Sequence, residues 1–184
     1  MAGLVLGALT QASDRTPWLA ALFADRFGRR GLILLAALFA LSLNYALGVV
    51  GGLLVTALLT PEAKQLLLAL SLVLAGLGTG FALKAPDGLE GWRVGAVTTS
   101  FAGLAIMAFG DRMQFIVAAL AGRSPLPWAA AVGAVIGALA VDAYAIANGA
   151  AGWTALPLRA IRIAAAAMLT VAGIVLGLSA VGLV

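Results

Sequence analysis

Long apolar runs, separated by short polar segments, occupy most of this sequence. Because a helix of about 20 residues crosses a hydrocarbon core of roughly 30 Å, each run is long enough to span a membrane. Six runs are present, at about residues 2–24, 31–56, 64–83, 95–121, 127–149 and 159–183. They are continuous, without the alternating pattern of barrel strands. The sequence therefore predicts an all-α integral membrane protein with six transmembrane helices, in contact with the lipid bilayer.

The basic residues predict the orientation of these helices. Of the 11 Lys and Arg residues, seven fall in loops on one side of the predicted bundle: Arg26, Arg29, Arg30, Lys84, Arg93, Arg159 and Arg162. The other side has only Lys64 and Arg123. By the positive-inside rule, the seven-base side is cytoplasmic and both termini lie outside. We expect a multi-pass protein of a bacterial-type inner membrane or its equivalent, and no nucleic-acid partner because the bases form no cluster.

Two residue types are missing, which limits the possible chemistry. The chain has no Cys and no His, so thiolates and imidazoles cannot bind a metal or relay a proton. We see no nucleophile with its base and no phosphate-binding loop, so we expect neither an enzyme nor a cofactor. Any ion must be bound by oxygen donors.

The two halves of the chain resemble each other. The segment QASDRT at 11–16 aligns with AFGDRM at 108–113, which places Asp14 and Asp111 97 residues apart. Asn44 and Asp142 follow in the next predicted helices, 98 residues apart. With three spans in each half, the second half would enter the membrane from the opposite side, as in inverted-repeat transporters. We expect one membrane domain, 1–184, made of repeats 1–83 and 95–184 and a connecting loop, 84–94.

Both aspartates fall near the middle of a predicted span, together with an arginine. Buried charges in a membrane usually face the bundle interior and have partners. Adjacent residues of a helix point in different directions, so we expect Asp14 to pair with Arg112 and Asp111 with Arg15, across the repeat interface. Three residues are predicted hinges that break or bend these helices: Ser13, Pro17 and Gly110. Thr16 is predicted to act as an internal cap.

These segments resemble a known motif. In the family of Golgi and thylakoid manganese/calcium-proton exchangers, the first helix of each of two three-helix repeats carries Glu-x-Gly-Asp-Lys/Arg-Thr/Ser. Here SDRT at 13–16 and GDRMQ at 110–114 are similar to it, and the six-helix layout extends the resemblance over nearly the whole chain. The resemblance implies exchange of Mn²⁺ or Ca²⁺ for protons at a site built from both motifs, with Asp14 and Asp111 as the metal-binding acids.

The chain departs from that motif at four positions. Gln11 and Ala108 replace the two glutamates, and Ser13 and Met113 replace a glycine and a hydroxyl. Gln11 retains a carbonyl oxygen, whereas Ala108 has no ligand to offer. We therefore expect a weakened or altered cation site, for which the candidate ion-binding residues are Asp14, Asp111, Gln11, Thr16, Asp142 and Asn44. Proton coupling would depend on one of the three aspartates.

Two alternatives remain open from the sequence. In the first, the protein is a non-transporting membrane scaffold or regulatory subunit, and its Asp and Arg residues form structural ion pairs. In the second, it transports another substrate, which could be an anion because Arg15 and Arg112 lie in the predicted site.

Overall fold

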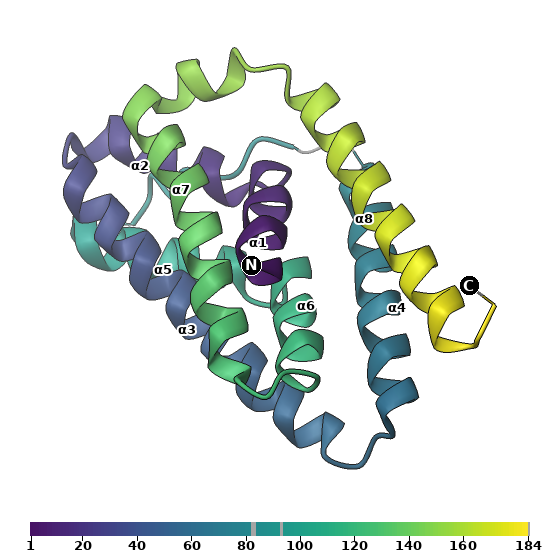
Figure 1. The fold of residues 1–184 in the computed structure, drawn as a ribbon. Helices are drawn as coiled ribbons and strands as arrows, with labels where there is room; N and C mark the ends of the chain where they lie inside the picture. Colours follow the sequence, from purple (N-terminus) through teal and green to yellow (C-terminus); the bar gives the residue numbers. More distant parts are fainter. Residues whose placement is uncertain (82–83, 93, 184) are drawn as a thin grey trace.

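The computed structural model describes residues 1–81, 84–92 and 94–183, which form eight α-helices (Figure 1). The helices are α1 (Ala2–Ala12), α2 (Thr16–Phe27), α3 (Arg30–Thr56), α4 (Pro61–Thr79), α5 (Ala96–Ala108), α6 (Arg112–Ala121), α7 (Pro127–Thr154) and α8 (Leu158–Ala180). Arg93, the end of the predicted span 64–83 and the last residue of the second repeat lie outside the described residues.

Four helices, α3, α4, α7 and α8, are long and apolar enough to cross a membrane. Helices α5 and α6 together qualify as a fifth span, bent by 69° at their junction, and α1 is a shorter apolar helix. The protein is thus an all-helical integral membrane protein with four or five candidate spans by length and composition. Two of the six predicted spans, 2–24 and 95–121, are each divided into two helices, at the positions where the sequence predicted a break or bend.

The helices pack in reciprocal pairs. Helix α1 packs on α7 as α5 packs on α3, and α2 packs on α7 as α6 packs on α3. Helices α4 and α8 lie side by side, at the edge of the other six (Figure 1). The two halves therefore share both an order of elements, two short helices followed by two long ones, and a packing pattern.

Glycines permit the closest of these contacts. A Cβ on Gly7 of α1 would lie 2.5 Å from the Ala134 carbonyl oxygen of α7, and one on Gly137 of α7 would collide with the Leu4 carbonyl of α1. Gly76 of α4 likewise lies against Thr170 of α8. Small residues allow helix backbones to approach and gain van der Waals contact where no hydrophobic force drives association in lipid.

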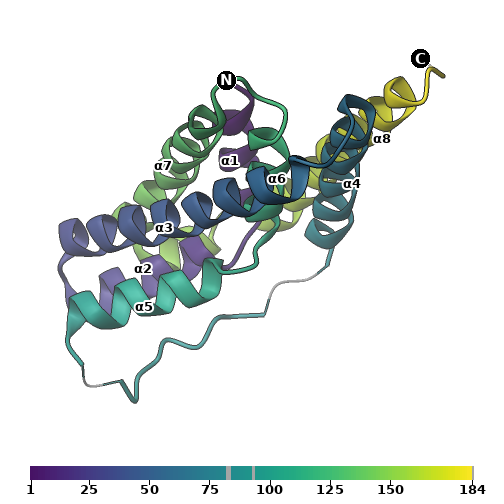
Figure 2. The ribbon, with the colours of Figure 1, turned by 90° about the horizontal axis from the view of Figure 1, so that it is seen from below.

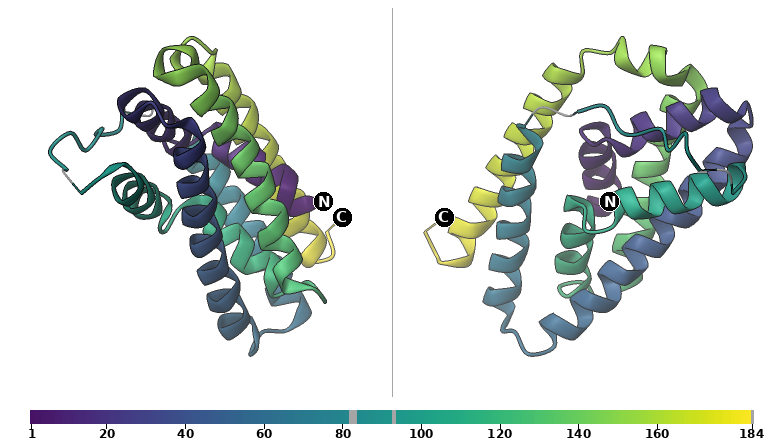
Figure 3. Two further views of the ribbon diagram at one scale, coloured as in Figure 1. Left: turned by 90° about the vertical axis from the view of Figure 1, so that its left-hand side faces the viewer. Right: turned by 180° about the vertical axis from the view of Figure 1, so that it is seen from behind.

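The loops gather at two ends of the bundle. At one end, the Arg26 guanidinium donates hydrogen bonds of 2.8–3.3 Å to four carbonyls of the segment joining α4 to α5, those of Gly88, Leu89, Glu90 and Trp92. Figures 2 and 3 show the described part of this segment, 84–92, running outside the helices. At the other end of α3, Lys64 and Arg123 line a polar pocket beside the end of α8. Arg26 thus meets the loop at 84–92, and Lys64 lies near Arg123, so each of these two pairs of segments lies together as the sequence predicted.

Candidate functional site

The first motif forms the break between α1 and α2. Ser13 ends α1, and its hydroxyl donates to the carbonyls of Leu9 (3.0 Å) and Thr10 (2.9 Å). The Asp14 carboxylate accepts hydrogen bonds from the Thr16 hydroxyl (2.7 Å) and the Thr16 amide (3.4 Å). Thr16 therefore opens α2 and donates to Asp14, instead of capping the helix as predicted. Pro17 follows in the first turn of α2, where its missing N–H costs nothing.

The second motif forms the break between α5 and α6. Gly110 has φ +73°, a left-handed conformation that glycine adopts without strain. Asp111 then caps α6, since its carboxylate accepts a hydrogen bond from the Gln114 amide at 2.7 Å. The Gln114 side chain accepts from the Gly110 amide (2.7 Å) and donates to the Asn44 carbonyl of α3 (3.1 Å). These bonds fix the position of the break against α3.

Arg112 connects the two breaks. Its Nη2 lies 3.2 Å from the Asp14 carboxylate and donates to the Ser13 carbonyl at 3.3 Å, while its Nη1 donates to the Thr79 hydroxyl of α4 at 2.7 Å. The predicted contact between Asp14 and Arg112 is thus present. The reverse pair is not formed within the described part of the chain, because the Asp111 carboxylate is bound to the start of α6 instead of to Arg15.

A pocket of about 350 Å³ opens at this junction. Its lining includes Asp14 and Arg15 from the first motif, Gly110, Asp111 and Arg112 from the second, and Gly78, Phe81, Met107 and Phe109 around them. Two carboxylates and two guanidiniums therefore share one cavity at the meeting point of two broken helices. Within the described residues, no group of three or more acidic, His or Cys side chains is arranged to hold a metal. Any cation here would take two carboxylates and neutral oxygens.

Gln11 and Asp142 lie outside this pocket lining, in the packed interface of α1 and α7. The Gln11 amide donates to Asp142 Oδ1 at 2.7 Å, and both side chains are buried, Asp142 completely. Asn44, also buried, donates to the Ala105 carbonyl of α5 at 3.2 Å and to the Ala40 carbonyl at 2.9 Å. Asn44 and Asp142 thus each link a long helix to the short helix that precedes a motif.

Three residues of the site were missed in the sequence. The pattern Asp-x-x-Gln from Asp111 to Gln114 is a capping signal that could have identified Gln114. Thr79 is a single hydroxyl in an apolar helix, and nothing in the sequence indicates that it faces Arg112. Tyr45 follows Asn44 and is completely buried, and its hydroxyl has no hydrogen-bond partner among the described residues.

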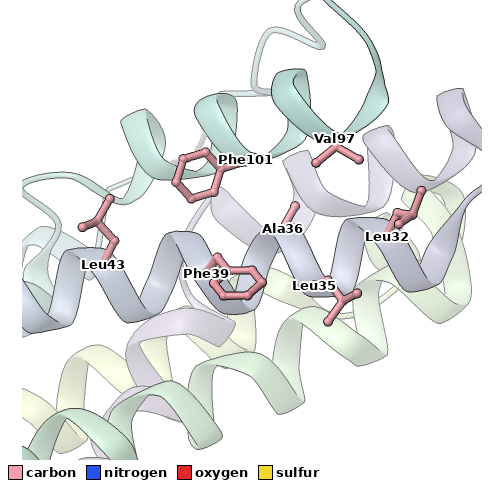
Figure 4. A pocket seen from close by; sticks show the side chains of 7 residues that line it. All are labelled: Leu32, Leu35, Ala36, Phe39, Leu43, Val97 and Phe101. Carbon is pink, nitrogen blue, oxygen red and sulfur yellow. The ribbon is translucent and has the colours of Figure 1, made fainter.

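The apolar groove between α3 and α5 is a different kind of feature (Figure 4). Seven apolar side chains line it: Leu32, Leu35, Ala36, Phe39, Leu43, Val97 and Phe101. None of them belongs to a motif or carries a polar atom, so the groove suits hydrocarbon and cannot bind an ion.

Comparison with known proteins gives a match that covers the second half of the chain. The family model of the divalent cation/proton antiporter GDT1 matches residues 96–182, which contain α5 to α8. The second half of the chain is therefore similar to this family, and the match supports membership in it. The match supports a membrane transporter of the cation/proton antiporter type in general. No curated protein and no solved structure matches the chain.

Proposed function

We propose that this protein exchanges Mn²⁺ or Ca²⁺ for protons, using the pocket that both motifs line. One observation carries the proposal: Asp14 and Asp111, acids from opposite halves of the chain, line one cavity where two helices are broken. Hard divalent cations prefer carboxylate and carbonyl oxygens. Broken helices provide carbonyls with no helical partner, and transporters use them for ion sites near the bilayer midplane.

The proposed layout is six spans in two inverted three-helix repeats. The pairs α1–α2 and α5–α6 would be the broken first spans of each repeat, and the helices α3, α4, α7 and α8 the continuous ones. Reciprocal packing of the two halves supports this layout. The side rich in Lys and Arg would be cytoplasmic and both termini external. Alternating access would follow from rocking of the repeats, with Ser13, Pro17 and Gly110 absorbing the change.

Asp14 and Asp111 would be the metal ligands, assisted by the Thr16 hydroxyl and by backbone carbonyls. A carboxylate about 4 Å from a unit charge contributes roughly 4 kcal/mol at an effective dielectric of 20, before desolvation. A site without the two motif glutamates is therefore weaker than one with four acids. Arg112 also competes with a cation for Asp14, because its Nη2 contacts Asp14 Oδ1 in the structure. We expect Arg112 to move aside when the metal binds.

Thermal unfolding with added metal tests this proposal. A ligand present at 100 times its Kd stabilises the folded state by about 2.7 kcal/mol. We expect Mn²⁺ or Ca²⁺ to raise the Tm of the purified protein, and Asp14→Asn and Asp111→Asn each to remove most of that rise. Glu62→Gln is the matched control, since Glu62 is an acid at the far end of α4. An equal rise in all four proteins, or none in the native chain, would refute the proposed site.

The ion pair itself favours a second candidate, a non-transporting scaffold. Arg112 already satisfies Asp14, so the pair is able to hold the two breaks together without any substrate. In that case Asp14→Asn would lower stability, and neither metal would raise the Tm. A Tm raised by an anion in place of a metal would instead indicate binding at Arg15, which also lines the pocket.

A further inference from the structure

Asp142 differs from the other two intramembrane acids in its surroundings. It is completely buried in α7, and its Oδ1 accepts one hydrogen bond, from the neutral amide of Gln11. Its Oδ2 is enclosed and has no hydrogen-bond partner among the described residues. By contrast, the Asp14 side chain is 20% exposed and contacts Arg112, and Asp111 caps α6. Both of those acids line the pocket of about 350 Å³ between the two motifs, which we call the motif pocket.

Among the residues that the structure describes, no cation forms an ion pair with Asp142. Helix α1 presents Gln11 to Asp142. On α3, the Tyr45 hydroxyl is likewise buried without a partner in the described structure. Asp25 of α2 binds the Ala150 amide further along α7, and Arg112 of α6 is bonded to Asp14. Asp14, three residues after Gln11 in the chain, is a further acid and adds no positive charge.

An ionised carboxylate in such a place is costly, because burial without a paired cation removes its hydration and gives little in return. A bound proton removes that cost and needs no additional space. A metal ion needs a cavity and several ligands, whereas the side chain of Asp142 has no accessible surface. The environment therefore suits a proton and not a metal.

We propose that Asp142 carries the exchanged proton, with Gln11 as its positioning residue, while the metal binds separately in the motif pocket. This inference rests on the proposed exchange function. When rocking of the repeats opens Asp142 to water, the proton leaves Oδ2 for a water molecule as that O–H bond breaks, and the carboxylate keeps the electron pair. Gln11 lies three residues before Asp14 in the chain, so movement of the end of α1 links the two sites. The added negative charge also favours entry of a cation into the pocket.

Two variants and infrared spectroscopy test the proton site directly. The native protein in liposomes is expected to show the C=O band of a protonated carboxyl at neutral pH, and Asp142→Asn, which is isosteric, to lack it. Gln11→Ala retains the acid but removes the hydrogen bond to Oδ1, so the band should shift to higher frequency. Thr10→Val is the matched control on α1, because the Thr10 hydroxyl bonds only within its own helix. A band that persists in Asp142→Asn, or is unmoved in Gln11→Ala, would overturn the inference.

Coupling of the proton to the metal is measured in the same liposomes. In Asp142→Asn, we expect Mn²⁺ to raise the Tm as in the native protein, while stimulation of Mn²⁺ uptake by a pH gradient falls at least tenfold. Native stimulation in a folded Asp142→Asn protein would refute the proton role. If the native chain shows no Mn²⁺ effect at all, the exchange function fails, and the infrared band still decides whether Asp142 holds the proton.

Discussion

Arg112 Nη2 lies 3.2 Å from Asp14 Oδ1, which is 98 residues away in the chain, and so joins the two helix breaks. The same guanidinium also binds the Ser13 carbonyl and the Thr79 hydroxyl. One side chain therefore holds the end of α1, the start of α6 and the end of α4 in register. Loss of this contact should affect both stability and the shape of the motif pocket.

Arg112→Met and Asp14→Asn should be energetically coupled. Both side chains are about one-fifth exposed, so the pair lies between an exposed pair, worth under about 1 kcal/mol, and a fully buried one. We expect a coupling free energy of about 1–2 kcal/mol from a double-mutant cycle on unfolding in detergent. Additivity within about 0.3 kcal/mol would show that the pair does not hold the breaks together.

Asp111→Asn should separate the structural role of Asp111 from its charge. Asn is as good an N-cap as Asp, whereas Ala in place of Asp costs about 1 kcal/mol. We therefore expect Asp111→Asn to unfold near the native midpoint and Asp111→Ala to be less stable, with neither variant stabilised by Mn²⁺. Metal stabilisation retained in Asp111→Asn would exclude this carboxylate as a ligand.

Gly110→Ala should be destabilising by about 1–2 kcal/mol, since φ of +73° strains a residue with a Cβ. A Cβ at this position would meet nothing within 4 Å, so crowding does not contribute. The control is Gly51→Ala, also in open space but inside α3, where alanine is expected to be neutral or stabilising by up to about 1 kcal/mol. Equal midpoints for the two variants in thermal unfolding would contradict a conformational role for Gly110.

Gly137→Ala should separate α1 from α7 and so disturb the contact of Gln11 with Asp142. The added methyl group would collide with the Leu4 carbonyl, a backbone atom that a rotamer change cannot move. Overpacking of this kind typically costs about 1–3 kcal/mol. Thermal unfolding against Gly51→Ala measures the effect, and unchanged stability would show that the two helices are less closely packed.

The sequence predicted the two breaks and one of the two ion pairs. Pro17 removes a backbone donor and Gly110 permits a left-handed conformation. Both effects are local, so the positions of the breaks could be predicted without knowledge of the packing. The contact of Asp14 with Arg112 followed from the repeat. The other predicted pair, Asp111 with Arg15, is not formed. Asp111 has a nearer partner, the Gln114 amide at the start of α6, which competes with a distant guanidinium.

The remaining contacts depend on helix packing, which no local pattern determines. Gln11 and Asp142 were both candidate residues, but their hydrogen bond requires α1 to lie against α7 in one rotational setting. Thr79 faces Arg112 for the same reason, through the position of α4 beside α6. Single polar residues in apolar helices indicate interior faces, and they do not identify their partners.

Metal flux into proteoliposomes under an imposed pH gradient tests the central claim most directly. We predict that the native chain takes up Mn²⁺ or Ca²⁺ while protons move in the opposite direction, and that folded Asp14→Asn and Asp111→Asn proteins lose this uptake at least tenfold. Glu62→Gln should transport as the native chain does. Flux no greater than that of empty liposomes, from native protein shown to be folded and inserted, would contradict the account.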